Sequence, residues 1–235
     1  MKLIIAKDYE ELSRQAAALI AAQVLQKPAC VLGLATGSSP IGTYQKLIEW
    51  HKSGLLDFSA VSTANLDEYE GLTGDHPQSY ACFMRENLFD HINISPAATN
   101  IPGTDYDTYD ALIDSMGGID LQILGIGHNG HIGFNEPADS FSVLTHREEL
   151  TPTTIEANAR FFTADETQPT SAFTMGIGTI MKAKKVVLVA NGAGKAEIIK
   201  AMVQGPVTPQ VPASILQIHP DVTVVIDEAA AALLK

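Results

Sequence analysis

Short apolar runs alternate with amphipathic segments along the 235 residues of this chain, and this alternation limits its possible folds more than any other feature. The pattern is typical of a parallel sheet covered by helices. The apolar runs predict strands at Leu3–Ile5, Ala29–Leu34, Val61–Thr63, Leu121–Leu124, Val186–Ala190 and Val222–Ile226. The amphipathic segments predict helices after Asp8, from Pro40 to Trp50, from Pro77 to about Asp90, over Asp105–Met116 and over Gly194–Val203.

No internal repeat or long linker interrupts this alternation. We therefore expect a single α/β domain over residues 1–235, doubly wound, with a mostly parallel, Rossmann-like sheet flanked by helices. In such open sheets ligands bind beyond the carboxyl ends of the strands. The loops that follow the predicted strands are accordingly the places to look for a site.

Charge and hydropathy argue against two classes of partner. The formal net charge is −12, and the densest basic run is Lys182, Lys184 and Lys185, so we expect no nucleic-acid partner. The longest apolar stretch, around Ala16–Leu25, is interrupted by Gln23 and is too short to span a bilayer, so we expect no membrane partner. An anionic small molecule remains possible, because a pocket needs only one or two well-placed cations.

The two cysteines and the first residues indicate a compartment. Cys30 and Cys82 lie far apart and form no CxxC motif, so both are interpreted as small buried side chains rather than as a disulfide or metal framework. The first eight residues become charged too early for a signal peptide. We expect a cytoplasmic protein.

A Gly- and Ser-rich loop, Gly33–Pro40, follows the second predicted strand and opens a helix. Gly37 permits close approach to the backbone, and the free N–H groups at a helix start favour an anion. The loop is neither a Walker motif nor a dinucleotide GxGxxG fingerprint. An ordinary capped strand–helix turn explains it equally well.

Two adjacent acids, Asp67 and Glu68, follow the strand Val61–Thr63 within the segment Asn65–Tyr69. A carboxylate at this place can act as a general base that takes a proton from carbon next to a carbonyl. The alternative is a solvated loop that caps a helix.

The densest group of polar residues is Gly125–Pro137, after the strand Leu121–Leu124. Histidine can shuttle protons near neutral pH, which makes His131 a candidate acid/base that Glu136 could orient. The rival is a metal site formed by His128, His131 and Glu136. The intervening Asn-Gly favours a turn over a rigid ligand face, and we interpret His128 as a solvated neighbour.

Two cations complete the candidates. Arg160 lies in Asn158–Phe162, and Lys195 follows a Gly-rich turn at the start of a helix. There Lys195 opposes the helix dipole, and an anionic ligand would compensate it. The alternative is a solvated lysine.

Taken together, the sequence resembles the glucosamine-6-phosphate deaminase/isomerase family nearly from end to end. The segments that carry the resemblance are Leu34–Pro40, Asn65–Tyr69, Asp75–Tyr80, Gly125–Pro137, Ala159–Phe162 and Pro212–Gln217. The resemblance implies ring opening of glucosamine 6-phosphate, proton transfer from C2 to C1, and loss of ammonia to give fructose 6-phosphate. It implies no cofactor and no metal, with a small phosphosugar as the partner.

The resemblance also implies a role for each matching residue. Asp67 matches the base that moves the proton between C2 and C1. His131 matches the ring-opening acid/base, with Glu136 as its partner. Asn129 stands where several members carry aspartate, so we expect it to orient rather than to carry charge. The residues that match the phosphate site are Thr36, Gly37, Ser38, Ser39, Arg160 and Lys195.

Two other functions compete with this interpretation. A 6-phosphogluconolactonase shares the Gly-x-Gly-x-x-Gly-His block, but Asn135 and Glu136 after it favour the deaminase, and a lactone needs no base aimed at C2. A phosphosugar-sensing domain of a transcription regulator would carry an added DNA-binding segment, and from the strand at the start and the net charge of −12 we expect none here.

Two expectations concern size and motion. The polar segment 138–168 is interpreted as a lid. Only Asp227–Lys235 follow the last predicted strand, room for about two helical turns. From this we expect the short form of the family, a monomer or small homo-oligomer with hyperbolic kinetics.

Overall fold

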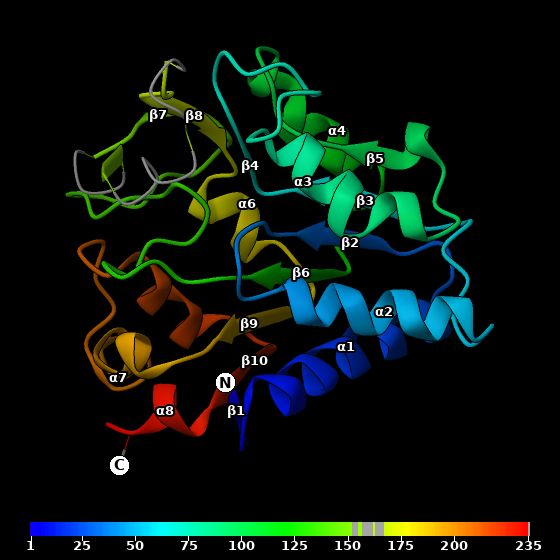
Figure 1. Cartoon of the computed structure of the whole chain (residues 1–235). Coiled ribbons are helices and arrows are strands. Elements are labelled where there is room, and N and C mark those ends of the chain that lie inside the picture. Colours follow the sequence, from blue (N-terminus) through cyan, green and yellow to red (C-terminus); the bar gives the residue numbers. More distant parts are fainter. Residues whose placement is uncertain (152–154, 157–161, 163–166, 235) are drawn as a thin grey trace.

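A central sheet of seven parallel strands forms the middle layer of the protein (Figure 1). This computed structural model describes residues 1–151, 155–156, 162 and 167–234. The strands lie side by side in the order β1 (Lys2–Ala6), β10 (Val222–Asp227), β9 (Val186–Ala190), β6 (Leu121–Leu124), β2 (Val31–Leu34), β3 (Ser62–Asn65) and β5 (Thr99–Asn100). All six predicted strands are present, and the mostly parallel α/β sheet is confirmed.

The direction of winding reverses between β2 and β6. From β2 the chain adds β3 and then β5 on one side, and it returns to place β6 and β9 on the other. The loops after β2 and β6 therefore flank the crevice at the reversal, which is the ordinary ligand site of an open α/β sheet. These loops are the two Gly-rich segments found in the sequence.

Helices pack on this sheet, and the side chains of Asp8, Ser79 and Asp227 cap the starts of α1, α3 and α8. Asp8 accepts the N–H of Glu11 at 2.8 Å and starts α1, which packs against α2 and the strands β1, β9 and β10. The α-helices are α1 (Tyr9–Gln26), α2 (Ile41–Lys52), α3 (Tyr80–Asn87), α4 (Tyr109–Ser115), α6 (Ile177–Met181), α7 (Ala196–Gln204) and α8 (Glu228–Ala231). Short 3₁₀ turns span Phe89–His91, Pro96–Ala98, Tyr106–Thr108, Ala193–Lys195 and Pro212–Ile218. None of the described helices is both long and apolar enough to cross a membrane.

A second, antiparallel sheet was not expected from the sequence. It consists of β4 (Asp67–Tyr69), β8 (Ser171–Thr174) and β7 (His146–Glu149), in the order β4-β8-β7. In Figure 1 it lies to one side of the central sheet, beside α6. The acids of β4, expected in a loop, are thus strand residues. Strands this short, polar and far apart in sequence give too weak a periodic signal to be recognised.

The predicted lid segment, 138–168, contributes to this second sheet. Its residues His146–Glu149 form β7 and pair with β8 along their length. Ranges 152–154, 157–161 and 163–166 lie outside the described residues. A small apolar cluster of Tyr69, Phe134, Leu150 and Ala172 packs the second sheet against the loop that follows β6.

Candidate active site

Polar groups from both sheets gather at the winding reversal. The loop after β2, the strand β4, the loop after β6 and the turn before α7 supply them. Sequence analysis singled out residues in each of these segments.

Asp67 is the first residue of β4 and only 7% exposed. It lies opposite Thr174 in the β4–β8 ladder. Burial, followed by the neighbouring charge of Glu68, raises the pKa of its carboxyl to about 8. Within the part of the chain that the structure describes, no group donates a hydrogen bond to this carboxylate. Asp67 is therefore a buried acid with both oxygens available to a ligand.

Glu68 has a different role from its neighbour. Its Oε1 accepts the main-chain N–H groups of Tyr69 at 2.8 Å and Tyr80 at 2.9 Å, and its Oε2 accepts that of Ala81 at 2.9 Å. The last two donors belong to the first turn of α3, so Glu68 caps this helix across space. The helix cap that the sequence offered as an alternative is thus Glu68, whereas Asp67 stays the candidate for the general base.

Tyr80 connects β4 with the loop after β2. Its ring centroid lies 4.9 Å from that of Tyr69, and burial raises the pKa of its hydroxyl well above the usual value, with the Thr36 side chain beside it. Its ring is stacked on Phe134 with centroids 5.9 Å apart and planes 2° apart. The phenol thus stays protonated and joins three segments of the site.

The loop after β6 brings Asn129, His131 and Glu136 together. Glu136 is buried, and its Oε2 accepts a hydrogen bond from Asn129 Nδ2 at 2.5 Å. The same oxygen lies 3.6 Å from His131 Nδ1, too far for an ordinary hydrogen bond but close enough for electrostatic attraction. The main-chain N–H of His131 in turn donates to Asn129 Oδ1 at 3.2 Å. Asn129 thus bridges the histidine and the glutamate, consistent with an orienting role.

Two glycines let this loop close around its histidine. A Cβ at Gly127 would lie 2.3 Å from the His131 ring, so the imidazole occupies the space that a side chain would need. At Gly133, where φ is +60°, a Cβ would lie 2.7 Å from Thr174 Oγ1. The glycines of this loop are therefore needed because the backbone passes close to the side chains of His131, Thr174 and Asp67.

Lys195 reaches the same loop from the turn before α7. Its ammonium donates to the carbonyl oxygen of Ile126 at 2.6 Å, and burial lowers its pKa. It is the N-cap residue of α7, so the helix does not compensate its charge. Arg160, the other predicted cation, lies outside the described residues.

The loop Thr36–Ser39 is held by two residues that sequence analysis missed. The hydroxyl of Tyr9 donates to the carbonyl oxygens of Ser38 and Ser39, at 3.0 and 3.2 Å. Ser39 Oγ donates to Asn191 Oδ1 at 3.1 Å. Gly37 has φ of +93° and is exposed, as a backbone that receives a ligand requires. Tyr9 lies in a segment with no motif of its own, and Asn191 opens the Gly-rich turn before Lys195 without having been singled out.

The rival metal site receives no geometric support. Among the residues that the structure describes, no three His, Cys, Asp or Glu side chains are grouped so as to hold an ion. His128 is exposed.

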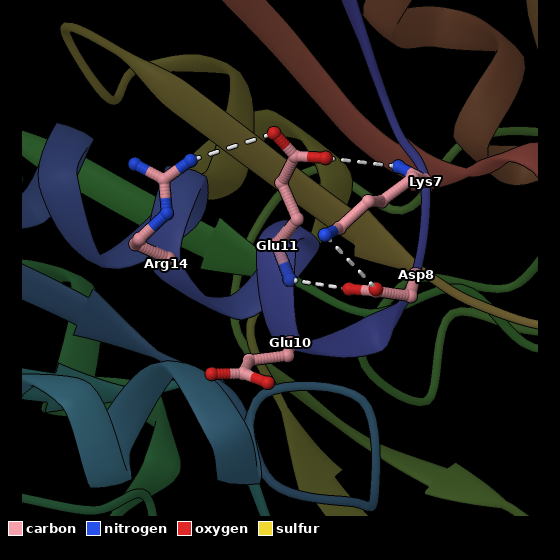
Figure 2. A pocket seen from close by; sticks show the side chains of 5 residues that line it. All are labelled: Lys7, Asp8, Glu10, Glu11 and Arg14. Carbon is pink, nitrogen blue, oxygen red and sulfur yellow. Dashed lines mark hydrogen bonds and ion pairs between the residues drawn. The ribbon is translucent and has the colours of Figure 1, made fainter.

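A separate surface hollow of about 180 Å³ lies where β1 meets α1 (Figure 2). There Glu11 accepts the N–H of Lys7 at 3.1 Å and contacts Arg14 at 3.4 Å, while Glu10 points away. Asp8 caps the helix at the same place. These contacts are those of a solvated helix start, so the hollow is not a candidate site.

Comparison with known proteins adds a family and a fold. Residues 7–225 match the family described as glucosamine-6-phosphate isomerases/6-phosphogluconolactonase. A glucosamine-6-phosphate deaminase of Lachnoclostridium phytofermentans is 58% identical over 232 residues, which are 96% of this chain and 98% of the relative. A solved monomeric glucosamine-6-phosphate deaminase superposes with a TM-score of 0.95 at 44% identity, covering 99% of this chain and 100% of that one. The 6-phosphogluconolactonase of Leishmania guyanensis, at 19% identity and a TM-score of 0.77, covers 100% of this chain and 98% of its own and shares the fold.

Proposed function

The chain belongs to the family of glucosamine-6-phosphate isomerases and 6-phosphogluconolactonases, and within it we propose that the chain is a glucosamine-6-phosphate deaminase. It converts glucosamine 6-phosphate and water to fructose 6-phosphate and ammonia, a step in amino-sugar breakdown. The observation that carries this proposal is the 58% identity to a deaminase over 96% of the chain. The buried, unengaged carboxylate of Asp67 beside the loop of His131 is the site that such a reaction needs.

The first step opens the sugar ring. His131 relays a proton from the C1 hydroxyl to the ring oxygen, and the C1 carbonyl forms as the bond to the ring oxygen breaks. Glu136 Oε2 lies 3.6 Å from His131 Nδ1 and helps to fix the position of the ring during the relay. Asn129 orients both groups.

The second step moves a proton from C2 to C1. Asp67 removes the C2 proton while a proton of the substrate's ammonium group moves to the C1 oxygen, which gives an enolamine. Asp67 then returns its proton to C1, which leaves a hydroxyl at C1 and an iminium at C2. A pKa of about 8 makes this carboxylate a stronger base than an exposed aspartate. Water then adds to C2 and ammonia leaves, so that the product carries the C2 carbonyl.

The phosphate is bound between the two Gly-rich turns. Lys195 supplies a partly desolvated positive charge, and the turn Thr36–Ser39 supplies main-chain N–H groups and hydroxyls. Arg160, which matches the phosphate site of the family, supplies a second cation in this proposal. The solved relative described as monomeric supports a monomer in solution, and a cytoplasmic location stays a prediction.

A lactonase is the alternative function of this family. Solved lactonases share the fold at 19% identity, whereas the deaminase relative is 58% identical. Purified protein treated with a chelator is expected to release equal amounts of ammonia and fructose 6-phosphate from glucosamine 6-phosphate. Hydrolysis of 6-phosphogluconolactone without ammonia release from the amino sugar would refute the proposal.

A further inference from the structure

Glu68 and Asp67 are adjacent buried carboxyls that the structure treats unequally. We propose that Glu68 is a positioning residue that keeps the negative charge of the pair, so that Asp67 is the carboxyl that takes up and releases the proton. The proposal rests on the proposed function and assigns Glu68 a part in it.

The hydrogen bonds of the two carboxylates differ. Glu68 accepts three main-chain N–H groups, from Tyr69, Tyr80 and Ala81, at 2.8 to 2.9 Å. Asp67 accepts none from the described residues. Hydrogen bonds to a carboxylate favour its ionised form, and two of these donors lie at the positive end of a helix. Burial raises the pKa of the Glu68 carboxyl, but these three donors act against that rise, and Asp67 has no such donors among the described residues. Of the two carboxyls, Glu68 is therefore the better place for a lasting negative charge.

The surroundings of the pair contain little to offset a second charge. The titratable groups on which the charge of Asp67 acts are tyrosines from the elements packed around it: Tyr44 on α2, Tyr69 on β4, Tyr80 on α3 and Tyr109 on α4. On β8 its partner is the neutral Thr174, and the loop after β6 carries His131 and Glu136. Among the described residues no lysine or arginine stabilises either carboxylate.

Two like charges in such a place do not both ionise easily. Because Glu68 holds its charge through fixed donors, the electrostatic cost falls on Asp67 and strengthens it as a base. Glu68 touches no reacting atom in this arrangement. It acts through the charge it keeps and through the position in which it holds β4 against α3.

The test removes the charge of Glu68 and keeps two of its three hydrogen bonds. In Glu68→Gln the remaining carbonyl oxygen can still accept from Tyr69 and Tyr80, which share Oε1 in the wild type, whereas the N–H of Ala81 loses its acceptor. Removing the charge lowers the pKa of Asp67, so the acid limb of kcat/KM moves to lower pH by about one unit or more. At a pH well below the wild-type limb, kcat/KM as a fraction of its plateau value should then be roughly tenfold higher in the variant than in the wild type. A folded Glu68→Gln enzyme whose acid limb stays at the wild-type pH would overturn the proposal.

Ser79→Ala is the matched control. Ser79 Oγ accepts the N–H of Cys82 at 3.0 Å, so this change weakens the same helix start without altering any charge. The acid limb of Ser79→Ala is expected to coincide with that of the wild type. An equal shift in both variants would show that helix geometry rather than the charge of Glu68 sets the limb.

A measurement on the wild-type protein does not depend on the variant's folding. Carbon-13 labelling of aspartate and glutamate carboxyls, with Asp67→Asn for assignment, gives both titrations by NMR. We expect Asp67 to protonate at higher pH than Glu68, and the reverse order would overturn the proposal. The titration is decisive even for a protein that releases no ammonia, so its outcome is separate from that of the proposed function.

Discussion

Thr174 lies directly opposite Asp67 in the β4–β8 ladder, and its hydroxyl oxygen accepts the main-chain N–H of Phe134 at 3.0 Å. Thr174 of β8 is therefore next to both β4, which carries Asp67, and the loop after β6, which carries His131. Next to it, the carbonyl oxygen of Met175 accepts from Asn135 Nδ2 at 2.8 Å. The end of β8 thus sets the spacing between the proposed base and the loop that carries His131.

Thr174→Val is expected to loosen this spacing. Valine matches threonine in shape but leaves the buried N–H of Phe134 without an acceptor, which costs about 1–3 kcal/mol of unfolding free energy. Turnover should fall as well, because the loop keeps only the bond of Asn135 to Met175 and loses its bond to the residue opposite Asp67. Urea denaturation and kcat measure the two effects. Thr174→Ser keeps the hydroxyl and should retain most of both, and a valine variant equal to the serine variant would contradict the spacing role.

Most of the central sheet could be predicted from sequence because its inner strands are buried on both faces. Val186–Ala190 is continuously apolar and Val222–Ile226 is interrupted only by Thr223, so both runs carry their own signal. The two-residue edge strand β5 is too short to carry one. The second sheet carries no such signal. β4 is Asp-Glu-Tyr and β8 is Ser-Ala-Phe-Thr, and the partners lie more than a hundred residues apart. Their pairing depends on tertiary packing that periodicity does not express.

Only part of the candidate site could be predicted from the sequence. Asp67, His131 and Glu136 could be nominated because they are acids and a histidine in loops that follow predicted strands. The residues that position them could not be nominated. Tyr9 binds the loop after β2 through a hydroxyl on the first turn of α1, and Thr174 acts through its place in a ladder. Neither residue type is distinctive until the chain is folded.

Asp67→Asn is expected to nearly abolish turnover and yet to stabilise the fold at neutral and alkaline pH. An amide cannot accept the C2 proton, and losing a general base costs on the order of 10²–10⁴ in rate. The folded-state pKa is about 8 against an ordinary 3.8, so the folded protein holds a proton that the unfolded chain releases. Wild-type stability is therefore lost as pH rises through that window.

Asp67→Asn has no carboxyl at this position and does not lose stability in this way. The difference in unfolding free energy between the variant and the wild type should therefore grow in favour of the variant between about pH 4 and pH 8. Urea denaturation at pH 5 and pH 8 compares the two proteins. Asp90→Asn, at an exposed aspartate on the 3₁₀ turn Phe89–His91, serves as the control and should show no such trend. A constant difference between Asp67→Asn and wild type at both pH values would contradict the buried-acid interpretation.

His131→Gln is expected to slow the closed ring more than the open chain. The proton relay ends once the ring is open, so a substrate analogue that cannot cyclise bypasses the step. Rates for glucosamine 6-phosphate and for such an analogue give the comparison. Equal losses on both substrates would assign His131 a different role.

The protein is expected to be a monomer with hyperbolic kinetics. The solved relative described as monomeric covers 99% of this chain at a TM-score of 0.95. Without a subunit interface, two global states of an assembly are not available to produce cooperativity. Sedimentation at several concentrations and rate curves over a wide substrate range provide the measurement. Sigmoidal curves that N-acetylglucosamine 6-phosphate renders hyperbolic would contradict it.

Lys195→Ala is expected to raise KM strongly for the phosphorylated substrate. Its ammonium is held against the Ile126 carbonyl and partly desolvated, so a phosphate beside it would gain more than at an exposed lysine. Removing one partner of such a pair costs roughly 2–5 kcal/mol, or about 30- to several-thousand-fold in affinity. Lys52→Ala removes an equal charge from the exposed end of α2 and should leave KM unchanged. Unphosphorylated glucosamine should be a very poor substrate of the wild type and of both variants. The kcat/KM for glucosamine should be no lower in Lys195→Ala than in the wild type. A loss of equal size for both sugars would mean that Lys195 supports the loop of His131 and does not bind the phosphate.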